Sequence, residues 1–367
     1  MHLHDSGNCS RRRVSVSGSK PAEDHLNRPA PSAALHMAGP LVDGFGRVHT
    51  SLRISVTDRC NLRCFYCMPP EGVPFRSHDE ILSFEEIERF VRVAAGLGVR
   101  KIRLTGGEPL VRKHVCRLVE MLANVPQIDD LALTTNGVLL CQYASALKAA
   151  GLDRLNISLD SLSREKYRRI TRFDELPQVL KGIAAARNAG FRQIKLNALA
   201  IRGLTEEEVV PLAQFALENQ LLLRFIEFMP ATTRDRWDAD RVLTGREILT
   251  ILAEAMGPLE PISQDGSPAP ATEYRFVDGS GRIGLIASVS QPFCTRCNRL
   301  RLTAEGEVRN CLFARREWDA RAALRSGSTD DQLARLIVAC VRAKKESRGT
   351  DDGQFGHSRR AMYQIGG

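Results

Sequence analysis

The chain has 367 residues, of which 43% are hydrophobic and 26% are charged. This ordinary globular balance excludes a mostly disordered, collagen-like or coiled-coil chain, and no apolar run reaches the roughly 18 residues of a membrane span. Lys and Arg number 52 against 43 Asp and Glu, a net charge of +9. The excess suggests an anionic partner, such as nucleotide phosphates, nucleic acid or anionic lipid, without choosing among them. The length predicts two domains, or one barrel with extensions.

The start of the chain is predicted to be a disordered tail. Residues 1–44 are rich in Ser, Pro, His and Arg and show no apolar periodicity. No secretory signal opens the chain, so its ten cysteines are interpreted as metal ligands or catalytic groups rather than as a disulfide framework. We therefore expect a protein of the reducing cytoplasm.

Short β-prone runs alternate with helical stretches from residue 50 onward. The predicted strands are Leu52–Val56, Lys101–Thr105, Asp130–Thr134, Arg154–Leu159, Gln193–Ala198 and Leu222–Phe228. The predicted helices between them are Phe84–Leu97, Val115–Ala123, Leu140–Ala150, Glu175–Ala189 and Thr205–Asn219. Ser83 and Glu86 form a capping box before the first helix, and Gly98, Gly151 and Gly190 follow three of them.

This alternation predicts parallel βαβ units with right-handed crossovers. Six units are too few for a closed eight-stranded barrel, which leaves an open, partial barrel or a doubly wound sheet. The alternation of strands and helices ends after about residue 240. Residues 258–272 have a linker composition, and Tyr274–Val289 has a hairpin pattern. We predict one α/β domain over residues 45–260 and a smaller C-terminal α+β module over residues 261–367.

Polar or glycine residues stand at the ends of all six predicted strands. The second strand is followed by Thr105-Gly106-Gly107-Glu108-Pro109, and the fourth contains Asn156 and Ser158. Because the active site of an α/β barrel lies at the C-terminal ends of its strands, we expect one face of the fold to collect these groups. At a single strand, the same residues would indicate ordinary turn chemistry.

Three cysteines follow the first strand directly. Cys60, Cys64 and Cys67 form a C-x3-C-x2-C run. A structural zinc would need a fourth ligand, and none lies close in the sequence, since His78 is eleven residues away. Three cysteines also suit a four-iron, four-sulfur cluster with one iron left open, where a small molecule can bind.

A second group of cysteines lies near the C-terminus. Cys294, Cys297 and Cys311 form a C-x2-C-x13-C pattern. Alone, this pattern favours zinc, with a fourth thiol supplied by folding from Cys116, Cys141 or Cys340. Behind a first iron–sulfur site, it favours a second cluster with an open iron. Three arginines in the same segment suit an anionic ligand, because guanidinium groups bind phosphate oxygens in pairs: Arg299, Arg301 and Arg309.

The runs CNLRCFYC and TGGEP resemble the signatures of the radical S-adenosylmethionine superfamily. Within it, RISVTDRCNLRCFYC, KIRLTGGEPLVR, NISLDSL, RFIEFM, SVSQPFCTRCNRLRLTAEG and the final IGG are similar to the enzymes that cyclise GTP in molybdenum cofactor biosynthesis. The likeness runs from about residue 45 to 367 and is poor over residues 343–364. It implies a partial (β/α)6 TIM-like barrel with a C-terminal module that carries a second iron–sulfur cluster.

The resemblance also implies roles for individual residues. Cys60, Cys64 and Cys67 would hold a 4Fe-4S cluster whose open iron binds S-adenosylmethionine, and the residues lining that cofactor would be Tyr66, Gly107, Ser158 and Met229. A second 4Fe-4S cluster, in contact with the guanine of GTP, would be held by Cys294, Cys297 and Cys311. GTP would be met by Arg53, Arg103, Thr134, Lys195, Arg299, Leu300 and Arg301. Five cations match the roughly four negative charges of GTP.

The implied reaction is that of a lyase. A 5′-deoxyadenosyl radical takes the hydrogen at ribose C3′ of GTP, and C3′ then bonds to C8, giving (8S)-3′,8-cyclo-7,8-dihydroguanosine 5′-triphosphate. Gly366 and Gly367 resemble a tail that enters the active site and assists there. The partners implied are an electron donor such as flavodoxin or ferredoxin, a cyclic pyranopterin monophosphate synthase that takes the product, and a second copy of the chain in a homodimer. Neither a membrane nor a nucleic acid is expected as a partner.

Two other functions stay open at this point. A radical enzyme with an auxiliary cluster could act on a peptide, although the five cations favour a phosphorylated substrate. A basic, zinc-containing nucleic-acid-binding protein would explain the charge and both cysteine groups. That second interpretation leaves TGGEP and the polar strand ends unexplained, and only 6% of the residues are aromatic, which offers few surfaces for base stacking.

Overall fold

The structure is a computed structural model that describes residues 39–230, 237–263, 268–347 and 360–366. Residues 37–367 belong to one compact unit, to which everything below refers. Most of the predicted tail and Gly367 lie outside the described residues. The tail's last residues are described: Leu41 is buried, its backbone N–H donates to the Leu97 carbonyl at 3.1 Å, and Val42 forms a bridge with Val48.

Six parallel strands form the centre of the sheet, in sequence order. They are β1 (Ser51–Ser55), β2 (Lys101–Thr105), β3 (Asp130–Thr135), β4 (Arg154–Ser158), β5 (Ile194–Ala200) and β6 (Leu222–Glu227). Every predicted strand is present, with its ends within two residues of the prediction. Apolar residues that alternate with Arg53 and Arg103, such as Leu52, Ile54 and Leu104, are fully buried, because helices cover the outer face of the sheet.

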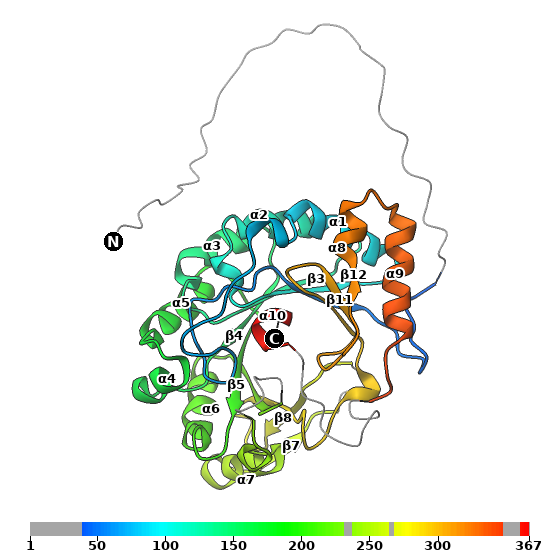
Figure 1. Cartoon of the computed structure of the whole chain (residues 1–367). Coiled ribbons are helices and arrows are strands. Elements are labelled where there is room, and N and C mark those ends of the chain that lie inside the picture. The colour runs from blue at the N-terminus through cyan, green and yellow to red at the C-terminus, as the bar shows by residue number, and fades with distance from the viewer. Residues whose placement is uncertain (1–38, 231–236, 264–267, 348–359, 367) are drawn as a thin grey trace, which may run out of the picture. The chain divides into compact units, whose positions relative to one another are not determined.

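The helices lie around the outside of this sheet, as Figure 1 shows in a view along the barrel. They are α1 (Phe84–Gly96), α2 (Val115–Ala123), α3 (Leu140–Ala149), α4 (Arg164–Thr171), α5 (Leu176–Asn188) and α6 (Val209–Glu218). The predicted capping box is confirmed, since Ser83 and Glu86 exchange bonds of 3.1 and 2.7 Å. Helix α4 was not predicted, because six of its eight residues are polar or charged and only Tyr167 and Ile170 are large and apolar.

The C-terminal part of the chain adds strands to both edges of the central sheet. On one edge, β9 (Arg282–Ile286) pairs in parallel with β6, followed by β8 (Thr272–Phe276) and β7 (Leu259–Pro261). On the other edge, β10 (Arg299–Leu302) pairs in parallel with β1, followed by β11 (Glu307–Arg309) and β12 (Trp318–Asp319). The predicted hairpin is β8 and β9. The open (β/α)6 barrel with a smaller C-terminal part is confirmed, and that part is divided between the two edges.

The remaining helices belong mostly to the same C-terminal region. They are α7 (Gly245–Met256), α8 (Ala320–Arg325), α9 (Asp330–Arg342) and α10 (Met362–Ile365). Short 3-10 helices occupy His78–Glu80, Pro109–Val111, Glu206–Glu208, Ala239–Arg241 and Cys294–Arg296. Helix α10 is set apart from the others, because it lies inside the ring of strands and helices and not outside it (Figure 1).

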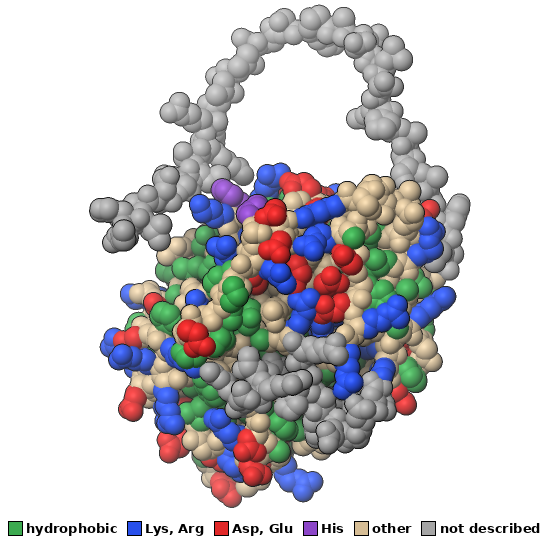
Figure 2. All heavy atoms as spheres, viewed as in Figure 1, with side chains coloured by type: hydrophobic (Ala, Val, Ile, Leu, Met, Phe, Trp, Pro, Cys, Tyr) green, Lys and Arg blue, Asp and Glu red, His purple; other side chains and the backbone are tan. Residues whose placement is uncertain are grey.

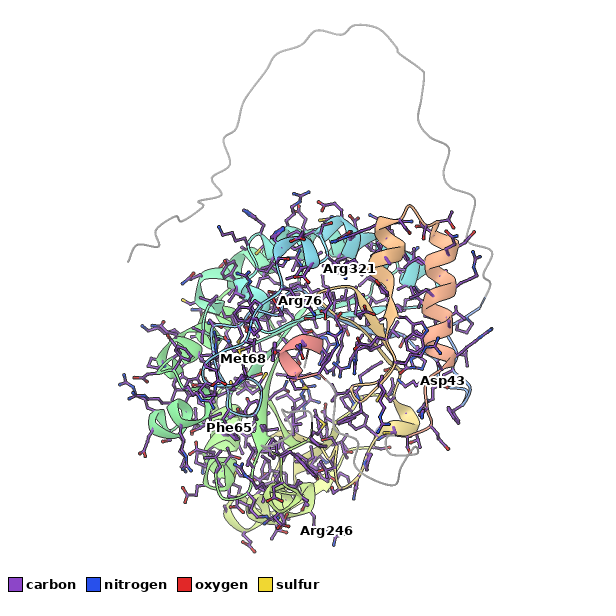
Figure 3. The ribbon with its side chains drawn as sticks, in the orientation of Figure 1. Asp43, Phe65, Met68, Arg76, Arg246 and Arg321 are labelled. Atoms are coloured by element: carbon purple, nitrogen blue, oxygen red, sulfur yellow. The ribbon has the colours of Figure 1, made fainter. Side chains whose placement is uncertain are left out.

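The surface of the molecule carries both positive and negative side chains (Figure 2). Side chains of both signs are spread over the face in Figure 2. Figure 3 labels Phe65 and Met68, in the loop after β1, on one side of α10, and Asp43 on the other side in the same view. No helix among the described residues is long and apolar enough to cross a membrane.

Leu300 tests the junction between β1 and β10. Its side chain is fully buried, so Leu300→Ala is expected to lower the free energy of unfolding by about 2–5 kcal/mol through lost contacts and a residual cavity. Urea unfolding under reducing conditions measures this. Val277→Ala is the control, because Val277 is 59% exposed and its truncation should change stability by no more than about 0.5 kcal/mol. Equal stability of the two variants would contradict the prediction.

Candidate functional site

A cavity of about 520 Å³ lies at the C-terminal side of the barrel strands. Its wall comes from β1, β2, β3, β5 and β6, and from the loops around β9, β10 and the end of α9. Nine of the residues predicted from the sequence line it: Arg53, Arg103, Thr134, Met229, Cys294, Cys297, Arg299, Arg301 and Cys311. Of the groups expected at the strand ends, Thr134, Asn197 and Met229 line the cavity, whereas residues 105–109, Asn156 and Ser158 are not among the lining residues.

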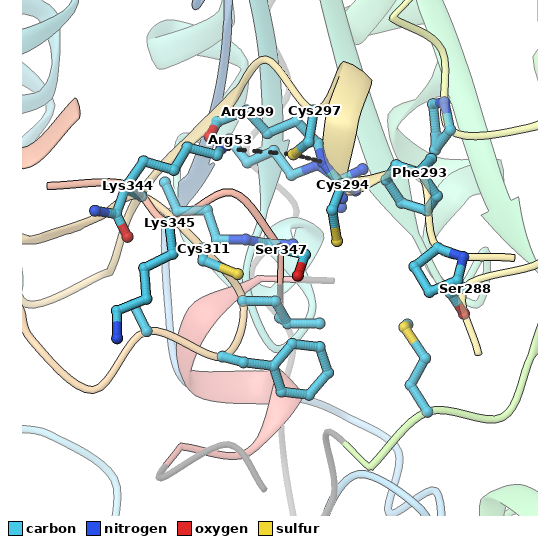
Figure 4. A pocket seen from close by; sticks show the side chains of 18 of the residues that line it. Arg53, Ser288, Phe293, Cys294, Cys297, Arg299, Cys311, Lys344, Lys345 and Ser347 are labelled. Atoms are coloured by element: carbon cyan, nitrogen blue, oxygen red, sulfur yellow. Dashed lines mark hydrogen bonds between the residues drawn. The ribbon is translucent and has the colours of Figure 1, made fainter. Parts of the chain in front are cut away.

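The C-terminal cysteine triad faces this cavity. Figure 4 shows the side chains of Cys294, Cys297 and Cys311 around one space. Burial raises the pKa of the Cys297 thiol, but the Arg299 guanidinium and the Lys344 ammonium outweigh burial and bring that pKa to about 6. Thiolate is the form that binds metals. The donor set therefore fits an iron–sulfur cluster with three cysteine ligands.

Arginines form a row across four adjacent strands. Arg53 of β1 is in register with Arg103 of β2 on one side and with Arg301 of β10 on the other. Arg301 is in turn opposite Arg309 of β11. Like charges on neighbouring strands repel each other, and the repulsion is stronger away from water. Burial, together with the charges of Arg299 and Arg301, lowers the pKa of Arg53, so an anion bound at this row would reduce the repulsion.

The cavity wall is strongly positive. Ten Arg and Lys line the cavity and Glu346 is the single acidic residue, within the described part of the chain. Burial lowers the pKa of Arg103 and that of Arg301 to about 9 each, with the neighbouring guanidinium groups adding to the effect. An organic anion with several negative charges would relieve this repulsion. A neutral or cationic ligand would leave it in place.

Polar groups without charge complete the wall. The Thr134 hydroxyl is buried and has no hydrogen-bond partner among the described residues, which is costly unless a ligand supplies one. Nearby, Arg224 of β6 donates from Nε and Nη2 to the Asn197 amide oxygen at 3.0 and 2.8 Å. Both Arg224 and Asn197 line the cavity. Arg224 was not predicted, although a charged residue inside an otherwise mostly apolar strand is a signal in the sequence that could have found it.

Two further basic residues, which were not predicted, form hydrogen bonds with the loops of the second triad. Lys344 donates to the Cys297 sulfur at 3.5 Å and to the Arg299 carbonyl at 3.0 Å. Arg47 donates from Nη1 to the Cys294 carbonyl at 2.7 Å, and also to backbone carbonyls of Lys345 and Glu346. The first lies where the sequence likeness is poor and the second at the N-terminal hairpin, so neither could be joined to the triad from sequence.

The N-terminal cysteine triad lies in the loop after β1, and its members are not among the residues that line the cavity. Burial raises the pKa of Cys60 to about 11 and that of Cys67 to about 12, and nearby thiols add to the effect at Cys64 and Cys67. A positively charged metal cluster would favour ionisation of these three partly buried cysteines and take them as thiolates.

No three His, Cys, Asp or Glu side chains in the described ranges converge closely enough to hold a single metal ion. A four-iron cluster differs in this respect, since its ligands bind separate iron atoms at its corners.

Tyr66 and Gly107 stand next to the first triad. The Tyr66 hydroxyl donates to Asp160 at 2.7 Å, and burial raises its pKa further from neutrality. Gly107 packs directly on the backbone of the β1 loop: a Cβ there would lie 2.7 Å from the Arg59 carbonyl carbon and 2.9 Å from the Asp58 oxygen. Only glycine lets the TGGEP loop approach this loop so closely.

Three other predicted residues lie outside the cavity wall. Ser158 ends β4, and Leu300 has a fully buried side chain. Lys195 lies on the same face of β5 as the cavity-lining Asn197 but is not among the lining residues, and burial and the charges of Arg224 and Arg154 lower its pKa to about 8. Whether these three contact a ligand stays a prediction.

The end of the chain lies between the two triads. The Tyr363 backbone N–H donates to the Cys67 sulfur, Met362 lines the cavity, and the Gly366 carbonyl accepts from Arg301 Nη1. Gly366 has a φ of +69° and no room for a Cβ beside Thr105. The described part of the predicted Gly-Gly tail is therefore seated in the site.

Gly107→Ala is expected to displace the loop that carries the first triad. After anaerobic reconstitution, the variant should hold about four iron atoms per chain instead of about eight, because one of two four-iron clusters no longer assembles. Iron analysis measures this. Gly44→Ala is the matched control, since a Cβ at Gly44 meets nothing within 4 Å. A Gly107→Ala protein with a full iron content would contradict the prediction.

Two family models match consecutive parts of the chain. Residues 54–216 match the family model of the radical SAM superfamily, and residues 221–350 match that of Molybdenum Cofactor Synthesis C. A solved structure of coproporphyrinogen III oxidase from Escherichia coli, also a radical SAM enzyme, is 18% identical, with a TM-score of 0.43 over 56% of this chain and 51% of that chain.

Curated relatives cover nearly the whole chain. A GTP 3′,8-cyclase of Rhodopirellula baltica is 50% identical over 89% of this chain and 92% of its own length. One of Pelotomaculum thermopropionicum is 48% identical over 89% of this chain and 99% of its own length. The chain belongs to the GTP 3′,8-cyclase family of radical SAM enzymes.

Proposed function

We propose that this chain converts GTP to (8S)-3′,8-cyclo-7,8-dihydroguanosine 5′-triphosphate, the first step of molybdenum cofactor biosynthesis, with S-adenosylmethionine and two 4Fe-4S clusters. The observation that carries the proposal is the cavity in Figure 4, which joins a triad of cysteines to ten cations. Its charge fits a triphosphate, and its triad fits a cluster with one open iron.

The row of arginines is proposed to bind the triphosphate. Arg53, Arg103 and Arg301 lie side by side in the sheet, so their charges can be met by one ligand with roughly four negative charges. Arg299 extends the row towards Cys297, to which its Nε donates at 3.4 Å. Arg224, Arg47 and Lys344 add charge to the same wall. The Thr134 hydroxyl is proposed to contact the nucleoside.

The cysteine triad in the cavity is proposed to place the guanine. A 4Fe-4S cluster at Cys294, Cys297 and Cys311 would offer an open iron to a purine nitrogen or oxygen. With the base held by this triad and the phosphates by the arginine row, the ribose between them is oriented. Orientation of the reacting carbons is the main contribution that a protein makes to such chemistry.

The first triad is proposed to hold the cluster that binds S-adenosylmethionine, with Tyr66, Gly107, Ser158 and Met229 along the cofactor. That cluster supplies the electron which releases a 5′-deoxyadenosyl radical for hydrogen abstraction at C3′. The chain's own residues would bind and orient the substrate and shield the reacting carbons from water. Ile365 packs against Leu312, together with Met229, Phe313 and Met362. This apolar cluster would exclude water beside the reacting carbons.

The wider setting of the reaction stays a prediction. It comprises an electron donor such as flavodoxin or ferredoxin, a cyclic pyranopterin monophosphate synthase that uses the product, a homodimer, and a cytoplasmic location. The peptide-modifying and zinc-binding interpretations are not favoured, because neither accounts for a cavity with one acidic and ten basic residues next to a cysteine triad.

Anaerobic incubation with GTP, S-adenosylmethionine and a reductant tests the proposed function directly. Mass analysis should find the cyclised triphosphate, which has the mass of GTP and a different chromatographic and fragmentation behaviour, together with 5′-deoxyadenosine. The reconstituted protein should be brown, with about eight iron atoms. A colourless protein with one or two zinc ions, or protection against thermal unfolding by a peptide and not by GTP, would reverse the conclusion.

Arg299→Ala separates substrate binding from cofactor cleavage. Loss of one charged hydrogen-bond donor is expected to raise the Kd for GTP by about 10- to 100-fold, while reductive cleavage of S-adenosylmethionine continues. Arg301→Ala should behave likewise, and Cys64→Ala should abolish cleavage. Arg164→Ala is the control, since Arg164 pairs with Asp174 at an exposed site. Loss of cleavage in Arg299→Ala with unchanged GTP affinity would count against these roles.

A further inference from the structure

The C-terminal segment is fixed at its beginning by an arginine that the site described above does not use. Arg360 donates from Nε and Nη2 to the two carboxylate oxygens of Glu317, each at 2.6 Å. Its Nη1 also pairs with Glu305. A two-pronged pairing of this kind fixes the orientation of both side chains as well as their distance.

These contacts belong to a compact group of charges. Glu317 pairs with Arg309 of β11 as well as with Arg360. The side chains are 1% exposed at Arg309, 10% at Glu305, 18% at Arg360 and 21% at Glu317. Two positive and two negative charges therefore balance each other largely out of water, where the loss of one partner leaves an uncompensated charge. We call these four residues the tail anchor.

Strand β10 holds the other end of the segment. Arg301 of β10 donates to the Gly366 carbonyl and is directly opposite Arg309 in the sheet. Arg309 reaches Arg360 through Glu317. Glu317 also neutralises Arg309, so that Arg301 alone of this pair remains available to the tail carbonyl and to the cavity. Residues 361–366 are thus held at one end by Glu305, in the turn after β10, and by Glu317, directly before β12, and at the other end by Arg301.

Between these two fixed ends the segment has little freedom. Ile365 is fully buried, and Gly366 leaves no room for a Cβ beside Thr105. The Tyr363 backbone N–H reaches the Cys67 sulfur. If the segment moved by one residue so that Ile365 took the place of Gly366, the Ile365 side chain would clash with Thr105. The position of Arg360 therefore determines which residues reach each triad.

We propose that Arg360 is a positioning residue for the cyclisation: through Glu305 and Glu317 it fixes the register of residues 361–366 between the first triad and the cavity. The inference rests on the proposed function for its kinetic consequence, but not for its structural one. In Arg360→Gln, the segment should leave the site part of the time. S-adenosylmethionine would then still be cleaved, while hydrogen abstraction from GTP would fail more often.

Three measurements on the reconstituted holoenzyme test this. Arg360→Gln should lower kcat for the cyclised product by at least about tenfold, in line with the cost of misplacing a reacting group, and change KM for GTP by less than about threefold. The ratio of cyclised product to 5′-deoxyadenosine should fall, because cleavage becomes uncoupled. Carboxypeptidase should remove the C-terminal residues faster than from the native chain. Arg360→Lys keeps the positive charge but cannot form the two-pronged pairing, so its values should lie between those of the native chain and those of Arg360→Gln.

Arg325→Gln is the matched control. Arg325 lies in the same half of the chain, in α8, and pairs with Glu86 away from the tail, so its loss should leave all three measurements unchanged. If Arg360→Gln does not fold, Arg360→Lys and Glu305→Gln carry the test with smaller expected losses. Product ratios and trimming rates equal to native in these variants would overturn the proposal. So would a loss of product that merely follows the lost folded fraction. If the native chain makes no cyclised product, the proposed function is wrong. The rate of carboxypeptidase digestion would still test the tail anchor in that case.

Discussion

The central constraint on this protein is the repulsion among buried guanidinium groups. Arg103, Arg53 and Arg301 occupy one row of the sheet, and burial lowers the pKa of each. Folding brings these charges together without an equal number of carboxylates in the wall. The stability given up there is recovered when a polyanion binds. The proposed binding of GTP and the local stability would thus be two consequences of the same arrangement.

The division of the C-terminal strands between the two edges of the barrel makes this arrangement possible. Strand β10 places Arg301 beside Arg53, and β9 extends the sheet beyond Arg224 on the other edge. The open side of the barrel is left for the second cysteine triad, whose loops are tied down by Arg47 and Lys344. A separate domain joined by a linker could not supply charges in register with β1.

Much of the barrel could be predicted from sequence, because it is encoded locally. Apolar runs of strand length and the Ser83–Glu86 cap needed only neighbouring residues. The spacing of the cysteines indicated both triads, and Arg53 was expected from the resemblance to the radical S-adenosylmethionine enzymes. The roles of Arg47, Lys344 and Arg360 could not be predicted in this way. Each is an ordinary surface-type residue whose partners lie far away in the sequence, as Arg47 does from Cys294, and only folding brings them together.

The pairing of β1 with β10 has a consequence for synthesis of the chain. Arg53 and Arg301 are register partners although positions 53 and 301 are 248 residues apart. At about 5–20 residues per second, the ribosome takes about 12 to 50 s to make the strand that completes this edge. For that time the emerging barrel presents an unpaired edge at β1, a hazard for association with other chains. Residues that discourage such pairing are therefore best sought around β1, and slowed translation of the last quarter of the chain should favour aggregation.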